Sequence, residues 1–279
     1  MIIDFHTHLF PQEIRDHRDN YFSAEPAFKL LYSSSKSKTA GAAELIQTMD
    51  ENHVDKSVVF GFPWLNSETL KRHNDYVMEV VAKHSRRLIG LGCITPSGAH
   101  AVVEAERCIE GGLVGIGELA FYQSGIDESA LDQLTAIMQL CRDWGFPVLI
   151  HTNEPIGHRY PGKTPLSLAQ IYRLIKRFPK NKIVLAHWGG GIFFYSLLKK
   201  EVRNRLKNVF VDTAASPFLY DPLIYELAIK LIGVEKILFG SDYPLLPPSR
   251  YFDELEEAGL TSSQVDHICG ENARLLLKG

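Results

Sequence analysis

The sequence predicts an α/β protein of the (β/α)₈ TIM-barrel class. Eight short apolar runs alternate with eight segments of helical period along the 279 residues. The apolar runs are nearly continuous, as expected of parallel strands covered on both faces. Their starts lie about 25 to 55 residues apart, which suits one helix and two loops per strand. Eight such units that close on themselves form a barrel, whose active site lies at the carboxyl ends of its strands.

The strands are expected where β-branched and apolar residues cluster. They are Ile2–His6, Ser57–Gly61, Leu88–Ile94, Val114–Glu118, Pro147–His151, Ile183–His187, Val209–Thr213 and Ile237–Asp242. Between them, apolar residues recur at the helical spacing. The predicted helices are Ala42–Asn52, Glu68–His84, Ala99–Glu110, Ser129–Asp143, Leu166–Phe178, Phe193–Leu206, Asp221–Ile232 and Ser249–Glu257. Gly145 follows a helix as a C-terminal glycine, and Pro147 opens a strand where its missing N–H is tolerated.

One barrel domain, residues 1–279, is expected because the eight units occupy nearly the whole chain. An open doubly wound sheet is the alternative fold. It would normally carry a glycine-rich turn after the first strand, and residues 4–8, Asp-Phe-His-Thr-His, do not resemble one. The connection from Leu9 to Gly41 is unusually long. We expect it to cover the substrate as a lid, with a disordered insertion as the alternative.

Composition and charge narrow the classes of function. The chain has 30 Lys and Arg against 33 Asp and Glu, a net charge of −3 and a pI near 6.4. This balance argues against nucleic-acid and membrane partners and favours a small-molecule substrate. Without a signal peptide, a membrane-spanning run or a Cys-x-x-Cys pair, a cytoplasmic location and four buried thiols are expected. A homo-oligomer is compatible with the sequence, which does not set the oligomeric state.

Metal-competent side chains end five of the predicted strands. His6 and His8 end the first strand, and the period of two points both imidazoles to one side. Four further strands end in Glu118, His151, His187 and Asp242. All of these positions converge on one rim of a barrel. Together they predict a site for a divalent metal ion.

Four motifs carry a family resemblance. They are Asp-Phe-His-Thr-His-Leu-Phe-Pro at 4–11, Ala-His-Trp-Gly-Gly-Gly at 186–191, Phe-Gly-Ser-Asp-Tyr-Pro at 239–244 and Glu-Asn-Ala at 271–273. They resemble the amidohydrolase superfamily, specifically its amidohydrolase-related subgroup, over essentially the whole chain. The resemblance implies a divalent metal, usually zinc, held by His6, His8, His151 and Asp242. It also implies that His187 holds a second metal or orients substrate and water.

The residue types suggest catalytic roles. Zinc held by histidines and one carboxylate lowers the pKa of its bound water to about 7. Asp242 can take the proton of that water and deliver it to a leaving group, and His187 can polarise a carbonyl. Glu118 either bridges two metal ions or accepts a hydrogen bond beside one ion. We favour its contact with metal. Related decarboxylases do not usually carry a glutamate there, so Glu118 favours hydrolysis.

Substrate contacts are expected from the loop after the fifth strand, where Arg159 and Lys163 can bind a carboxylate or phosphate. His158 and Tyr160 add directional hydrogen bonds, while Trp188 and Tyr122 can wall the pocket. A solvated loop and packing aromatics are the alternatives.

The leading function is a metal-dependent hydrolase of an amide, cyclic amide, lactone or ester. The alternative is a metal-dependent non-oxidative decarboxylase of a small unsaturated or aromatic acid. The end of the first motif, Leu9-Phe10-Pro11, resembles the corresponding segment of such decarboxylases. A non-catalytic binding barrel is disfavoured, because burying these polar strand ends without a metal costs several kcal/mol.

Overall fold

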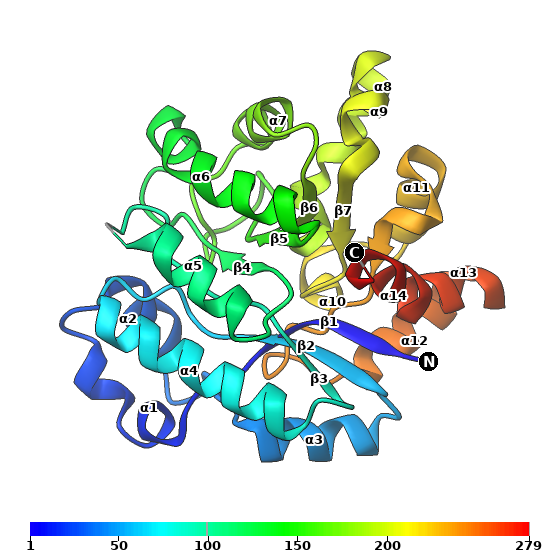
Figure 1. Cartoon of the computed structure of the whole chain (residues 1–279). Helices are drawn as coiled ribbons and strands as arrows, with labels where there is room; N and C mark the ends of the chain where they lie inside the picture. The colour runs from blue at the N-terminus through cyan, green and yellow to red at the C-terminus, as the bar shows by residue number, and fades with distance from the viewer. Residues whose placement is uncertain (99, 279) are drawn as a thin grey trace.

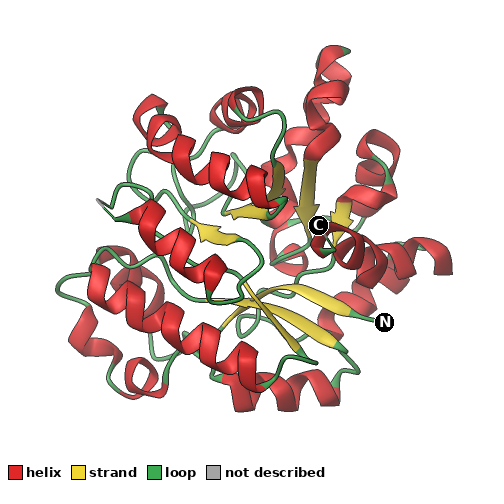
Figure 2. Ribbon diagram, viewed as in Figure 1, coloured by secondary structure: helices red, strands yellow, loops and turns green. Residues whose placement is uncertain are grey.

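The computed structural model describes residues 1–98 and 100–278. Its parallel strands run from the N-terminus as β1 (Ile3–His8), β2 (Lys56–Phe60), β3 (Leu88–Gly90), β4 (Ile116–Leu119), β5 (Pro147–Ile150), β6 (Lys182–Leu185), β7 (Val209–Asp212) and β8 (Ile237–Leu238). Regular pairing joins β1 to β3 in one sheet and β4 to β8 in a second, in sequence order. Figure 2 shows the strands at the centre and the helices around them.

Two seams join these sheets into a barrel. Between β3 and β4, the amide of Gly92 donates to Gly115 O at 2.9 Å. Between β8 and β1, the amide of Phe5 donates to Phe239 O at 2.7 Å, and the amide of Asp242 donates to His6 O at 2.9 Å. The predicted parallel barrel is therefore confirmed.

Apolar side chains pack on both faces of the strands. Inside it pack the buried side chains of alternate strand residues, among them Phe5, Val58, Leu91, Leu149, Val184 and Leu238. Outside, a larger cluster joins β4 to β8 to the buried faces of the surrounding helices. The four cysteines are buried and free. None of the helices in the described residues has both the length and the apolar character that crossing a bilayer requires.

The main covering helices are labelled in Figure 1. They are α3 (Ala42–Glu51), α4 (Ser67–Lys83), α5 (Ala101–Glu110), α6 (Glu128–Trp144), α7 (Leu168–Arg177), α11 (Leu223–Ile232) and α12 (Ser249–Glu257). Asp127 caps α6 by accepting from the amide of Ala130, and left-handed Gly145 ends it. Residue Ala99 of the predicted helix Ala99–Glu110 lies outside the described residues.

The predicted helix Phe193–Leu206 is broken. The structure has a 3₁₀ segment, η2 (His187–Phe194), followed by α8 (Tyr195–Leu198) and α9 (Glu201–Arg205). Extended backbone at Lys199, with φ −151° and ψ 126°, interrupts the helical period. Short helices unforeseen in the sequence complete the chain. They are α10 (Ser216–Leu219), η3 (Leu206–Asn208), η4 (Val234–Lys236), α13 (Ser262–Asp266), the π-helix η5 (His267–Glu271) and α14 (Asn272–Leu277).

The long connection after β1 is a packed cover. It contains α1 (Gln12–Asp16), η1 (Arg18–Tyr21) and α2 (Pro26–Tyr32), which Figure 1 shows next to α4. Phe10, Phe28 and Trp64 are fully buried in one aromatic cluster beneath it. Phe28 and Trp64 have ring centroids 4.5 Å apart. The connection is therefore ordered by its own apolar core, which favours the lid over a disordered insertion.

Candidate metal centre

The two histidines of β1 present their Nε2 atoms to the same point. His6 Nε2 and His8 Nε2 are 3.3 Å apart. Asp242 follows β8, the strand beside β1, and its Oδ1 lies 3.5 Å from His6 Nε2 and 3.4 Å from His8 Nε2. The side chain of His6 is fully buried, whereas 15% of the His8 side chain is exposed. The β8–β1 seam thus brings three predicted ligands together.

Asp212, at the end of β7, fixes the orientation of His6. Its Oδ2 lies 2.9 Å from His6 Nδ1, and both side chains are fully buried. The other oxygen, Oδ1, accepts from the backbone amides of His187 at 2.9 Å and Ala214 at 3.1 Å. A proton on His6 Nδ1 therefore points to Asp212, which leaves the electron pair of Nε2 available to a metal. The sequence analysis missed Asp212, although it ends the predicted strand Val209–Thr213 one residue before its boundary.

Glu118, at the end of β4, lies between two groups of histidines. Its Oε2 is 3.8 Å from both His6 Nε2 and His8 Nε2. Its Oε1 is 3.0 Å from His151 Nδ1 and 3.8 Å from His187 Nε2. Two triads of potential ligands therefore share this carboxylate.

The two later histidines are held by backbone carbonyls. His151 follows β5, and its Nε2 lies 2.9 Å from Gly162 O. His187 follows β6, and its Nδ1 lies 2.9 Å from Ala214 O. Each carbonyl accepts a hydrogen bond from one ring nitrogen, so His151 Nδ1 and His187 Nε2 are the nitrogens that face Glu118. All six predicted ligands therefore come together.

The carboxylates of the cluster favour positive charge on the side chains around them. Burial disfavours the charged form of His6, but the carboxylates of Asp212 and Glu118 outweigh it and raise the pKa of His6 to about 10. Burial likewise disfavours ionised Glu118, yet the charges of His151 and His6 hold the pKa of that carboxyl well below its usual range. The pKa of His187 is instead lowered, by burial and by the charge of His151. The carboxylates thus stabilise a cation among these side chains.

The donor set fits a divalent metal ion. Four ligand atoms at tetrahedral corners about 2.1 Å from one ion lie about 3.4 Å from one another. His6 Nε2 and His8 Nε2 lie 3.3 Å from each other and 3.4 to 3.8 Å from the carboxylate oxygens of Asp242 and Glu118. His8 Nδ1 is buried and has no hydrogen-bond partner among the described residues, so the Nε2 atom carries the polar contacts of that ring.

The residues predicted to contact substrate differ in their surroundings. Tyr122 lies against the cluster, where its ring stacks on His151 with centroids 6.2 Å apart. Trp188 is fully buried and donates to Ser216 Oγ at 2.8 Å. His158 and Arg159 are exposed, whereas Tyr160 and Lys163 both contact Glu154. Substrate binding by these residues stays a prediction.

Tyr32, at the end of α2, is a further residue near the cluster that the sequence analysis did not identify. Burial raises its pKa strongly, and the charges of Asp242 and Glu118 add to this effect. Its ring packs edge-on against Phe62, with centroids 6.1 Å apart, and Phe62 stacks with Tyr122 at 6.5 Å. These three rings form an aromatic wall beside the cluster. The aromatic residues of the 9–41 connection were the only signal in the sequence.

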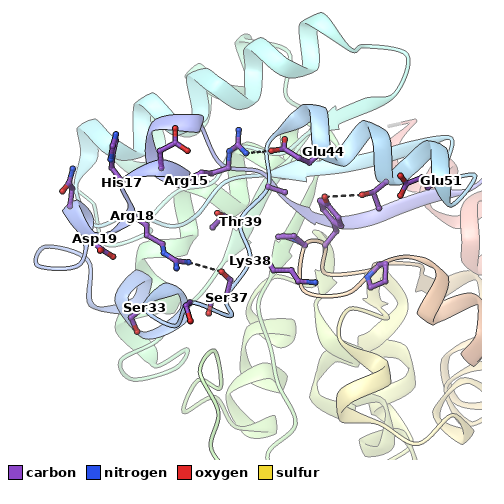
Figure 3. A pocket seen from close by; sticks show the side chains of 18 of the residues that line it. Arg15, His17, Arg18, Asp19, Ser33, Ser37, Lys38, Thr39, Glu44 and Glu51 are labelled. Carbon is purple, nitrogen blue, oxygen red and sulfur yellow. Dashed lines mark hydrogen bonds and ion pairs between the residues drawn. The ribbon is translucent and has the colours of Figure 1, made fainter.

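A large cavity lies outside this cluster (Figure 3). It has a volume of about 1040 Å³ and lies between α3, the 9–41 connection and the turn after β8. Its charges are mixed: Arg15 pairs with Glu44, while Arg18 donates to Ser37 O at 3.0 Å. None of the six predicted ligands lines it. The strand-end cluster is therefore the better candidate for the active site.

A parallel barrel with this cluster at the carboxyl ends of its strands defines a class of enzyme that works with a divalent metal. Within that class, the chain belongs to the amidohydrolase family, whose model matches residues 3–279. The predicted superfamily membership is confirmed.

Two relatives in sequence and several similar solved structures are decarboxylases. The chain is 24% identical to 2-amino-3-carboxymuconate-6-semialdehyde decarboxylase of Dictyostelium discoideum, over 97% of this chain and 90% of the relative. It is 25% identical to γ-resorcylate decarboxylase of a Polaromonas species, over 76% and 77% of the two chains. A structure of 5-carboxyvanillate decarboxylase from Novosphingobium aromaticivorans, complexed with manganese, has a TM-score of 0.78 and 16% identity, covering 100% of this chain and 96% of that one.

The two decarboxylases that are similar in sequence overturn the prediction of hydrolysis and support the alternative. The inference from Glu118 failed for a physical reason. A carboxylate among histidines stabilises a cation, and that property does not determine which bond of a substrate is broken. The comparisons and the cluster support a divalent metal, but the ion in the structural relative is manganese, so zinc is not confirmed.

Proposed function

We propose that the protein is a metal-dependent, non-oxidative decarboxylase of a small unsaturated or aromatic acid. The observation that carries this proposal is the similarity to a decarboxylase over 97% of the chain. The aromatic wall of Tyr32, Phe62 and Tyr122 supports it, because flat conjugated acids stack on aromatic rings. We also propose that residues 1–279 act as one domain.

The ligands in this proposal are the six side chains of the cluster. His6, His8 and Asp242 hold the ion from the β8–β1 seam. Glu118, His151 and His187 form the second triad, which either completes the same site or holds a second ion. Imidazole and carboxylate donors suit both zinc and manganese. When bound, the ion supplies positive charge that orients the substrate carboxylate and withdraws electron density from its conjugated system.

In the proposed reaction, the bond between the carboxylate and its carbon breaks and its electron pair stays on that carbon. Carbon dioxide leaves, and the carbon takes one proton. With the ion held by the other five side chains, His187 can deliver it, because its Nδ1 is held by Ala214 O and only Nε2 faces the cluster. The lowered pKa of His187 makes its imidazolium a stronger acid than free imidazolium, which favours proton release. Asp242 is the second group that can carry this proton.

The test uses the manganese-loaded protein with γ-resorcylate, 5-carboxyvanillate and 2-amino-3-carboxymuconate-6-semialdehyde. We expect carbon dioxide release from at least one acid and, in D₂O, one deuterium on the carbon that lost the carboxylate. H187N should lower kcat about 10²- to 10⁴-fold, whereas H158N in the exposed loop serves as its control. Release of no carbon dioxide from any of the acids contradicts the proposal, as does a product that retains all carbon and contains oxygen from H₂¹⁸O.

A further inference from the structure

We propose that residues 153–164, the loop after β5, form a clamp that positions His151 for the metal through the carbonyl of Gly162. The inference rests on the proposed metal centre. It assigns to Lys163 and Glu154 a positioning role, in which neither residue needs to touch metal or substrate. The clamp consists of a closed base, an internal ion pair and one hydrogen bond to the histidine.

The base of the loop is closed by a side chain. Asn153 Oδ1 accepts from the amide of Thr164 at 2.9 Å and from its hydroxyl at 2.7 Å. Both residues are buried, at 2% and 5% exposure. Because these two bonds join the first and last residues of the loop, its ends cannot separate without leaving buried polar atoms unpaired.

The interior of the loop is held by Lys163. Its Nζ lies 2.6 Å from Glu154 Oε1 and also donates to the carbonyls of Ile156 and His158, the latter at 3.3 Å. Tyr160 donates its hydroxyl to the other oxygen, Glu154 Oε2, at 2.7 Å. The side chains of Lys163 and Glu154 are only 12% and 14% exposed. This ion pair is therefore shielded from solvent more than a surface pair, which strengthens it.

The clamp reaches the cluster through one atom. Gly162 O, adjacent to Lys163 in sequence, lies 2.9 Å from His151 Nε2. A carbonyl oxygen can only accept, so this contact keeps a proton on Nε2 and leaves Nδ1 as the nitrogen whose proton a metal ion would replace. Nδ1 lies 3.0 Å from Glu118 Oε1, on the side of the second triad. Loss of the carbonyl would free the ring to rotate and to exchange its tautomer.

The Gly162 backbone is also tied to the lid. Its φ is +95°, in the region that favours glycine, and a Cβ there would lie 3.3 Å from Leu31 of α2. The carbonyl is therefore aimed by a backbone shape that the Lys163 contacts and the lid packing maintain together. Outer hydrogen bonds of this kind to metal-binding histidines typically contribute 10- to 100-fold in metal affinity.

The test measures the Kd of Mn²⁺ by competition with a chelator for wild type, K163M, E154Q and the double variant. K230M, in the exposed pair of Lys230 with Glu226, is the matched control. We expect K163M and E154Q to weaken Mn²⁺ binding about 10- to 100-fold. The fold loss of Mn²⁺ affinity in the double variant should be smaller than the product of the fold losses in the two single variants. Each of these three proteins lacks the same ion pair, so the second substitution breaks nothing further. K230M should bind as wild type does.

A second readout separates positioning from folding. The visible spectrum of the Co²⁺-loaded protein reports the ligands of the ion, and we expect it to change in K163M while circular dichroism shows a folded barrel. If K163M does not fold, E154Q carries the test. Unchanged Mn²⁺ affinity and an unchanged Co²⁺ spectrum in a folded variant overturn the clamp alone. A wild-type protein that binds no Mn²⁺ overturns the metal centre and the clamp together.

Discussion

Asp212 contacts three residues with its two carboxylate oxygens, and its substitution tests the orientation of His6. In D212N, the amide oxygen can still accept from the backbone amides of His187 and Ala214. The amide nitrogen would then face His6 Nδ1 as a donor, which forces the proton of His6 onto Nε2 and blocks the electron pair directed at the ion. We expect Mn²⁺ affinity to fall about 10- to 100-fold.

Chelator competition measures this loss. D221N is the control, because Asp221 is exposed and its side chain accepts from the nearby amide of Leu223. An affinity for Mn²⁺ equal to that of wild type in D212N would show that His6 does not depend on Asp212 for its tautomer.

His73 makes the stability of the protein depend on pH. It is 1% exposed, its Nδ1 accepts from Trp64 Nε1 at 2.8 Å, and its Nε2 donates to Leu9 O at 2.6 Å. Burial lowers its pKa to about 4, although the bond to Leu9 raises it. Between about 6.5 and 4, the unfolded chain binds a proton that the folded protein excludes, so stability falls as pH falls through this window.

The expected loss on going from pH 7 to pH 4.5 is about 2 to 3 kcal/mol from this residue. Urea unfolding at both pH values measures it as the difference between wild type and H73Q, since the other groups that titrate are common to both proteins. H100Q replaces an exposed histidine, and its loss of stability between pH 7 and pH 4.5 should equal that of wild type. An identical pH dependence in wild type and H73Q would contradict the assignment.

The candidate ligands were predictable from the sequence because each ends an apolar run. In a parallel barrel, the ends of these runs meet on one rim, so residue type and position were enough. Tyr32 and the Lys163–Glu154 pair were not predictable in the same way. Their positions depend on how the 9–41 connection and the 153–164 loop fold back on the barrel, and irregular backbone has no period from which a facing direction can be read.

At the scale of elements, the predicted strands and most helices have counterparts in the structure, and the turn after β6 is the main exception. Trp188, Gly189, Gly190 and Gly191 all have positive φ, from 58° to 81°. This run of left-handed residues turns the chain just before the predicted helix Phe193–Leu206 begins. The turn brings His187 and the glycines against the residues that follow β5.

Gly190 tests this turn. A Cβ on Gly190 would lie 2.5 Å from the carbonyl oxygen of Asn153, at the base of the 153–164 loop. Gly259 has a similar φ of +64°, but a Cβ there meets nothing within 4 Å. We expect G259A to cost about 1 kcal/mol, from left-handed backbone alone. G190A should cost about 3 kcal/mol, because the steric overlap adds to that strain.

Urea midpoints at constant slope measure both costs. The difference between the two variants isolates the close approach of Gly190 to Asn153. Equal destabilisation by the two substitutions would mean that this turn can relax away from the 153–164 loop.

At the scale of the whole molecule, the cluster lies across the seam that closes the barrel. His6 and His8 belong to β1, and Asp242 follows β8, so an ion held by all three joins the first strand to the last. The backbone hydrogen bonds across the seam include the amide of His8 to Tyr243 O at 2.8 Å and the amide of Asp242 to His6 O at 2.9 Å. Metal binding should therefore stabilise this seam more than the rest of the barrel.

Hydrogen exchange with and without Mn²⁺ measures this effect. An ion at 100 times its Kd stabilises the folded state by about 2.7 kcal/mol, so amides that exchange through openings of the site should exchange about 100-fold more slowly. We expect this at the amides of His8 and Asp242.

The amide of Phe178, which donates to Leu174 O beyond the end of α7, is the control. Its exchange should slow much less, because local opening of that turn leaves the metal ligands in place. Equal slowing at all three amides would mean that exchange requires global unfolding, and no slowing at the seam would mean that the ion does not join β1 to β8.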